Sequence, residues 1–147
     1  MSASNQFETA LLKLIFQNLP ITLIGDAAGL LPSAVAGNLY MGLHIAALDD
    51  TDSAQNTDEA TYTGYARAAI VRSAAGFTVV GDNVSNAALV GFPAVTAGAE
   101  SITHFSIGTA AAGIGSILVW GILDVAIAVS VGITPEFQIG QLNVTID

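Results

Sequence analysis

Short β-prone runs recur along most of this chain, and they limit its fold more than any other feature of the sequence. In the first clear run, residues 38–46, alternate positions are apolar: Leu39, Met41, Leu43 and Ile45. One face of that strand should line the core. Later runs, each bounded by Gly, Pro, Asn or Asp, are 62–73, 77–80, 86–92, 101–108, 116–123, 126–131 and 138–146. Short strands at this spacing indicate a sandwich or a barrel, and we expect a mainly β fold, an antiparallel, jelly-roll-like β-sandwich.

The last of these runs has the cleanest alternation. Leu142, Val144 and Ile146 fall on one side of it, whereas Asn143 and Thr145 fall on the other. This pattern predicts a half-buried strand at the end of the sequence.

One α-helix is predicted, and it lies at the N-terminus. Between residues 5 and 18, apolar side chains recur at helical spacing, namely Phe7, Leu11, Leu14 and Ile15. Asn5 is placed to cap the helix, Glu8 suits the positive end of its dipole, and Pro20 marks its end. Leu12 and Phe16 widen the apolar surface beyond one stripe, so we expect burial against the chain's own sheet and against a neighbouring subunit.

The sequence shows no evident linker, and its 147 residues are a common length for one domain. Residues 21–37 have no clean period and should form an irregular connection. We therefore expect a single domain, residues 1–147, in which residues 1–20 form an N-terminal helical arm and residues 38–147 form the β-sandwich.

Charged residues are scarce in this sequence. Three basic and twelve acidic residues make up 10% of the chain, whereas an average soluble domain has about 25% charged residues. Much of the folded surface must then be apolar, small or neutral, and such a surface invites partners. The composition therefore predicts self-association.

The composition also disfavours several classes of protein. The chain has no cysteine, which removes disulfides, thiolate catalysis and cysteine-based metal sites. A net charge of −9 with three basic residues opposes binding to nucleic acid. The longest uncharged run, residues 101–123, holds too many Ser, Thr and Gly residues for a membrane span. We see no signal peptide, so cytoplasmic synthesis is expected.

No catalytic, cofactor or metal site is predicted. His44 and His104 are the only side chains that ordinarily titrate near neutral pH, and no nucleophile motif surrounds either, so we expect hydrogen-bonded strand histidines. The acidic stretch from Asp49 to Glu59 should be an exposed loop. A Ca²⁺ site is the alternative there, although the EF-hand ligand order is absent. Residues 108–115 lack the order of a phosphate-binding loop and are typical of a turn between strands.

Several segments of the sequence form a recognisable set. They are residues 39–44 (LYMGLH), 62–67 (YTGYAR), 86–88 (NAA), 92–94 (FPA), 103–108 (THFSIG) and 132–137 (GITPEF), with the acidic loop between the first two. Together they resemble a family of small structural proteins of tailed bacteriophages, from about residue 7 to the C-terminus. The resemblance implies a virion protein made in the host bacterium, either tail-fibre-like or a head-decoration protein, with no catalytic residues to carry over.

Between these two roles we expect head decoration, because a tail fibre usually has long repeats or a coiled coil and this sequence has neither. The protein would be a homo-oligomer, with a trimer favoured, that binds the major capsid protein and cements the shell. The candidate contact residues are Phe7, Leu11, Phe16, Arg67 and Arg72. The two arginines should find carboxylate partners, either within the chain or across a subunit interface.

Other functions remain as alternatives. A tail-fibre or baseplate component would contact the host surface, and a carbohydrate-binding module would use the jelly roll as lectins often do. An enzyme is disfavoured because few ionisable residues are available. The sequence leaves open the head or tail location, the order of the oligomer and the surface that binds the particle.

Overall fold

The computed structural model describes residues 3–22 and 24–145, and the chain forms two compact units. The helical unit comprises Met1–Asn38, Val71–Leu89 and Gln138–Asp147, and the main-sheet unit comprises Leu39–Ile70 and Val90–Phe137. Each unit is therefore built from segments that are far apart in the sequence. The predicted single domain with a helical arm and a sandwich stays a prediction.

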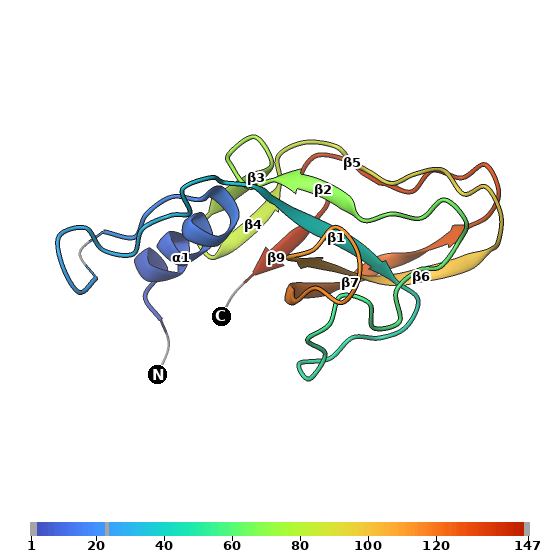
Figure 1. The fold of residues 1–147 in the computed structure, drawn as a ribbon, viewed down its shortest axis with the longest axis horizontal. Helices are drawn as coiled ribbons and strands as arrows, with labels where there is room; N and C mark the ends of the chain where they lie inside the picture. The colour runs from blue at the N-terminus through green and yellow to red at the C-terminus, as the bar shows by residue number, and fades with distance from the viewer. Residues whose placement is uncertain (1–2, 23, 146–147) are drawn as a thin grey trace. The chain divides into compact units, whose positions relative to one another are not determined.

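The helical unit packs one helix on a small antiparallel sheet. Its elements are α1 (Asn5–Gln17), β3 (Phe77–Val80), β4 (Asn83–Asn86) and β9 (Asn143–Thr145), with strand order β3-β4-β9. The helix lies against β3 and β4 (Figure 1). Leu12 and Phe16 are its buried residues, and the ring of Phe16 meets that of Phe77 edge-on with 5.1 Å between centroids. The predicted burial of the helix against its own sheet is thus confirmed.

The helix begins one residue earlier than the sequence predicts. Ser4 has extended backbone angles, and its side chain accepts a hydrogen bond from the Phe7 N–H, so Ser4 is the N-cap. The predicted cap, Asn5, is already helical. Ser and Asn are about equally good caps, which is why the sequence pattern could not separate two adjacent candidates.

Arg72 completes the other end of the helix. Asn18 adopts a left-handed conformation with φ 56° and ends the helix, two residues before Pro20. The Arg72 guanidinium donates hydrogen bonds to the carbonyl oxygens of Leu14 and Ile15. Because the helix ends here, no following turn supplies backbone N–H donors to these oxygens. A cation at this position also complements the helix dipole.

A buried asparagine secures the C-terminal segment of the helical unit. The Asn86 side-chain amide donates to the carbonyl oxygens of Ala88 and Gln138, and its oxygen accepts from the Leu142 N–H. Leu142 is buried and Val144 is half-buried, whereas Asn143 and Thr145 are exposed. The predicted half-buried strand is confirmed, although β9 is shorter than expected; Ile146 lies outside the described residues.

The main-sheet unit contains a four-stranded sheet and a short two-stranded ribbon. Strands β1 (Asn38–His44), β2 (Ala68–Val71), β6 (Glu100–Gly108) and β7 (Ile117–Val129) follow the order β2-β1-β6-β7 (Figure 1). The ribbon pairs β5 (Val90–Gly91) with β8 (Glu136–Phe137). The first residue of β1 and the last residue of β2 belong to the helical unit.

Strand β1 is covered on both faces. Its register with β6 places Met41 opposite Ile107 and Leu43 opposite Phe105, so these four apolar side chains share one buried face. The other face is also buried, because His44 lies there at 0% exposure. The predicted core positions are correct up to Leu43, whereas Ile45, beyond the end of the strand, is 42% exposed.

The predicted fold class is confirmed: the chain is mainly β, with antiparallel sheets and an N-terminal helix. Several predicted strand boundaries were wrong. Residues 62–67 are not a strand: a backbone hydrogen bond from Tyr65 to Tyr62 closes a turn, and Thr63 makes only an isolated β-bridge with Ala97. The strand is confined to Ala68–Val71. The predicted runs 116–123 and 126–131 are one strand, β7, which keeps its pairing with β6 across an irregularity.

Replacing Phe16 by alanine tests the core of the helical unit. Because Phe16 is fully buried against Phe77, we expect Phe16→Ala to lower the free energy of unfolding by about 3–5 kcal/mol. Phe7→Ala, on the same helix but at a residue 43% exposed, should cost less than about 1 kcal/mol. Urea unfolding followed by circular dichroism measures both, and equal losses would contradict the assignment of Phe16 to the core.

Candidate assembly surface

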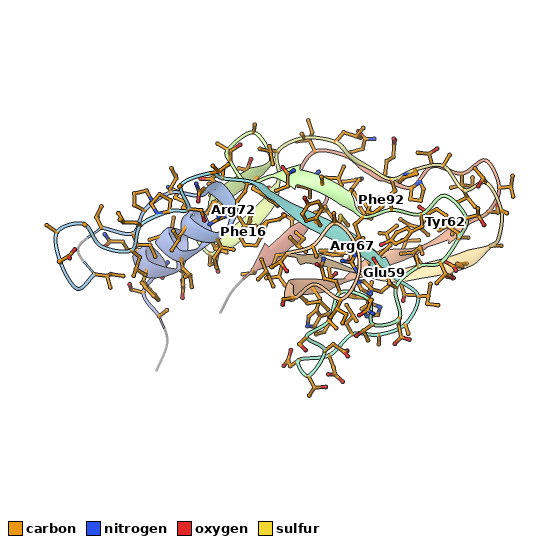
Figure 2. The ribbon with its side chains drawn as sticks, in the orientation of Figure 1. Phe16, Glu59, Tyr62, Arg67, Arg72 and Phe92 are labelled. Atoms are coloured by element: carbon orange, nitrogen blue, oxygen red, sulfur yellow. The ribbon has the colours of Figure 1, made fainter. Side chains whose placement is uncertain are left out.

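A cluster of buried polar side chains holds the acidic loop on the main sheet. Arg67 forms a bidentate ion pair with Glu59, with 2.6 Å from Nε to Oε1 and 2.8 Å from Nη2 to Oε2 (Figure 2). The Arg67 side chain is 2% exposed and that of Glu59 is 15% exposed. The Tyr65 hydroxyl donates to the same carboxylate and accepts from the Leu43 N–H. Both charges therefore have hydrogen-bonded partners inside the unit, and the carboxylate raises the pKa of Arg67.

The same cluster fastens the turn between β6 and β7. Arg67 also donates to the carbonyl oxygens of Ala110 and Gly113, at 2.9 Å and 2.7 Å. The buried Gln55 side chain accepts from the Ala110 N–H and donates to the Tyr40 carbonyl. These contacts confirm that residues 108–115 lead through a turn between strands.

Gly115 makes this contact between loop and turn possible. It has φ +55°, and a Cβ atom there would lie 2.4 Å from Oε1 of Gln55. A larger residue would be strained in its backbone and would displace the Gln55 side chain. The glycine therefore serves close packing of the turn rather than binding of a phosphate.

His44 is a neutral, hydrogen-bonded strand residue. Its Nδ1 lies 2.7 Å from the Thr57 carbonyl oxygen and its Nε2 lies 2.8 Å from the Ser106 hydroxyl oxygen. The carbonyl can only accept, so Nδ1 carries the proton and Nε2 accepts from the hydroxyl. Burial lowers the pKa of His44, outweighing the opposite effects of the Thr57 hydrogen bond and of Glu59. The structural role predicted for this histidine is confirmed.

Much of the acidic loop is exposed, including Ser53, Asn56 and Asp58. Asp49 and Asp50 are exposed, and hydrogen bonds from the side chain and backbone of Thr51 lower the pKa of Asp49. Gln55 and Glu59 are instead drawn into the unit, so the prediction of a wholly exposed loop was wrong for them. Among the residues that the structure describes, no group of three or more His, Asp or Glu side chains is placed to hold a metal ion.

Large apolar side chains are exposed in both units. In the helical unit the most exposed are Val35, Leu31, Val80 and Ile139, and in the main-sheet unit they are Val125, Ile114, Ile122 and Val131. The predicted self-association stays a prediction. The described helix is too short and too polar to cross a membrane.

Strand β7 concentrates this exposure in one element. It has 13 residues, of which Asp124 alone is charged, and only Val129 is buried. It is an edge strand, because the sheet order ends at β7. The sequence predicted strands here, but an almost continuous apolar run is typical of a strand covered on both faces. Its exposure was therefore missed, and the single charge at Asp124 was the only signal of it.

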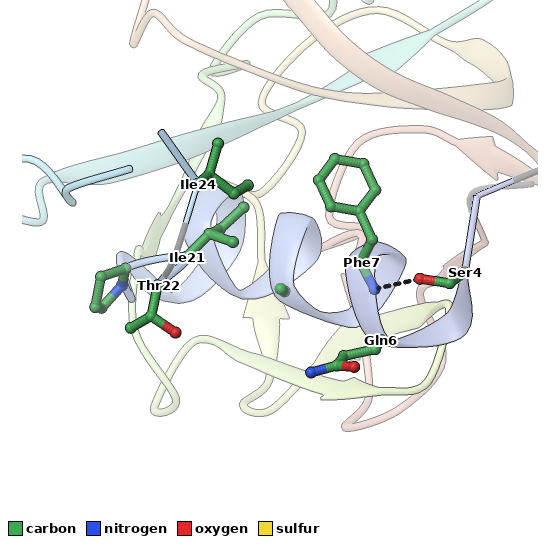
Figure 3. A pocket seen from close by; sticks show the side chains of 8 residues that line it. Ser4, Gln6, Phe7, Ile21, Thr22 and Ile24 are labelled. Carbon is green, nitrogen blue, oxygen red and sulfur yellow. Dashed lines mark hydrogen bonds between the residues drawn. The ribbon is translucent and has the colours of Figure 1, made fainter. Parts of the chain in front are cut away.

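A pocket with a mixed polar and apolar lining lies beside α1 in the helical unit. This cavity of about 290 Å³ is lined by Ser4 and the first turns of α1 and by Pro20, Ile21, Thr22 and Ile24; Phe7, Ile21 and Ile24 supply apolar side chains (Figure 3). Leu19, close by in a neighbouring pocket, is 45% exposed. The cavity has no cluster of charged side chains along its wall, and we assign it no ligand.

The five residues predicted to contact other subunits differ in their exposure and in their partners. Phe7 is exposed and Leu11 is half-buried, whereas Phe16 is buried in the core. Arg67 pairs with Glu59 inside the chain, which is one of the two arrangements expected for it. Arg72 donates to α1 carbonyls and to the Ser33 hydroxyl, so the carboxylate partner expected within the chain is absent among the described residues, and one across a subunit interface stays a prediction. Their role in contacts between subunits stays a prediction.

Removing the Glu59 charge tests the polar cluster. Glu59→Gln leaves the buried Arg67 guanidinium without its anion, so we expect the free energy of unfolding to fall by about 3 kcal/mol. Asp50→Asn, in the exposed part of the same loop, should change it by less than about 0.5 kcal/mol. Urea midpoints at pH 7.5 give both values, and an unchanged midpoint for Glu59→Gln would show that the pair does not stabilise the fold.

The buried His44 predicts a loss of stability in mild acid. Because its pKa is lowered in the folded state, the unfolded chain takes up the proton first as the pH falls below about 6.5. The free energy of unfolding should then drop by up to about 1.4 kcal/mol per pH unit, until the pH reaches the pKa of His44 in the folded state. Above pH 7, protonation of His44 should no longer change the free energy of unfolding. Unfolding curves between pH 7.5 and 5 check this slope, which should be smaller in His44→Gln and retained in His104→Gln.

Comparison with known proteins supports the resemblance found in the sequence. A family model described as "Podophage GP4 fiber I protein gp80" matches residues 2–145, which is nearly the whole chain. No curated protein matches the sequence significantly. The chain therefore belongs to the family of podophage GP4 fiber I protein gp80, and it is a structural protein of the bacteriophage virion.

Proposed function

We propose that this protein is a subunit of a virion fibre and that several copies of it associate to form the fibre. The family description carries this proposal, because it names a fiber protein and its model spans residues 2–145. The exposed apolar side chains support it, since they give a chain of net charge −9 an uncharged surface for association.

The polar cluster suits a mechanical task rather than a catalytic one. Buried Arg67, Glu59 and Gln55 tie a loop, a turn and the main sheet together without leaving a buried polar side-chain atom unpaired among the described residues. A subunit that is rigid in this way can transmit force through its sheet. The proposed role therefore needs no cofactor and no active site.

Head decoration is the second candidate. It is favoured by the absence of a long helix or extended strand repeat among the described residues, because the helix has only 13 residues and the units are compact. In that role a homo-oligomer, with a trimer favoured by the sequence argument, would bind the major capsid protein. A fibre built from compact subunits accounts for the same features, and it agrees better with the family description.

Labelling of intact particles separates the two roles. We expect gold-labelled antibodies against the purified protein to bind projections at discrete sites on the virion in electron micrographs. Even labelling over the head would overturn the fibre role and favour decoration. As a second measurement, purified protein should not bind expanded capsids that lack decoration proteins, and binding that protects those capsids from heat would also contradict the fibre role.

A further inference from the structure

On the outer edge of β7, away from β6, a short stretch of backbone pairs with no strand among the described residues. We call it the free stretch, and it is bounded at both ends. At its start, the Ile117 N–H donates to the Ser53 carbonyl of the acidic loop, so that position is occupied. The pairing of β6 with β7 shifts twice: Leu118 is an extra residue between Ile117 and Val119, and β7 has further extra residues after Ile122. From Leu118 to Ile122, the described residues provide no strand on the outer side.

This free stretch carries apolar side chains that are exposed or half-buried. Leu118 and Ile122 are 42% and 69% exposed, and Trp120 between them is half-buried. Ile122 lies opposite His104 and Trp120 lies opposite Ser106, so both side chains are on the face that carries these polar residues. Gly121, on the other face, leaves room for the Phe105 ring, because a Cβ atom there would lie 2.7 Å from it. The strand is thus fixed to β6 by packing on one face and open along its edge.

An open edge of this kind normally carries protection against pairing. Natural sheets use bulges, prolines or charged side chains, especially lysine, for that purpose. In β7 the longer irregularity and Asp124 protect the second half of the strand, and a one-residue bulge at Leu118 protects its beginning. From Val119 to Ile122 the pairing with β6 is regular, and no charge or proline lies there. This part of the strand is therefore left available for a partner strand.

We infer that a second copy of this chain pairs its own β7 with this stretch, antiparallel and about a two-fold axis at Trp120. In this arrangement Trp120 meets Trp120 of the second copy, and Leu118 meets Ile122. Aromatic and apolar pairs across antiparallel strands are favourable. At a two-fold axis the same surface patch of both copies is in contact, and pairs of this kind make such a patch self-complementary. The four-stranded sheets of the two copies then form one continuous sheet. This inference names the surface for the self-association in the proposed function, and in that sense it rests on it.

The charges of the chain favour a second copy in this register. Two chains of net charge −9 repel, so they can approach closely only where both are uncharged. With the axis at Trp120, each Asp124 lies four residues from the axis, which separates the two carboxylates by about 27 Å at about 3.4 Å per residue. That exceeds the screening length of about 8 Å at physiological ionic strength. An axis at Asp124 would instead place the two carboxylates opposite each other.

Cysteine cross-linking tests both the surface and the register, and the chain itself contains no cysteine. An equimolar mixture of Leu118→Cys and Ile122→Cys chains, oxidised with copper phenanthroline, should give a disulfide-linked dimer of the two variants. Each variant alone should give at least tenfold less, because its two copies of the cysteine would be about 14 Å apart, beyond the 7 Å that a disulfide spans. Val125→Cys on the same strand and Val35→Cys in the helical unit are exposed controls that should also cross-link weakly.

Trp120, the only tryptophan, reports the same contact without a new cysteine. Dilution of the wild-type protein should shift its fluorescence to longer wavelength as the mass measured by light scattering falls to that of a monomer. Ile122→Lys should weaken association at least 100-fold, whereas Val35→Lys should leave it unchanged. Equal cross-linking of all cysteine variants, or an oligomer whose mass Ile122→Lys does not change, would overturn the inference. Neither result depends on where the protein lies in the virion, so labelling of particles tests the fibre role separately.

Discussion

The ion pair between Arg67 and Glu59 is the interaction on which the main-sheet unit depends most. It joins the end of the acidic loop to the residue before β2, and through Ala110 and Gly113 it also reaches the turn that leads into β7. A buried pair is costly to desolvate and contributes to stability only when its hydrogen bonds are complete. Here the guanidinium donates to Glu59, Gln55 and two backbone carbonyls, so the requirement is met.

This use of charge explains how a chain with so few basic residues can have a defined fold. Arg67 and Arg72 both act inside the protein, one on a carboxylate and the other on the open carbonyls at the end of α1. Lys13 is then the one remaining basic side chain, against an excess of acidic groups. The charge on the surface is consequently mostly negative, so the proposed association between copies has to use its uncharged part.

The sequence predicted where the helix and strands lie better than it predicted which residues are buried or exposed. Alternation found β1 and the last strand, β9, and helical spacing found α1, because apolar side chains recur at the period of each of these elements. It failed at residues 62–67, where tyrosines of high β propensity form turns instead of a strand. It also failed for Gln55 and Glu59, since the burial of a polar residue depends on a partner brought close only by the fold. The exposure of β7 was hidden for a related reason, because an apolar strand has the same sequence whether its own chain or another copy covers it.

The inferred pairing across a two-fold axis has a consequence for the architecture of the proposed fibre. Such a contact uses the same patch on both copies, so it is complete with two chains and cannot by itself extend a filament. The acidic loop at one end of the free edge and Asp124 at the other further limit the pairing to a short stretch. A fibre of more than two copies would then need a second, different contact. The exposed apolar side chains of the helical unit, such as Leu31 and Val35, belong to no such pairing and leave surface for that contact.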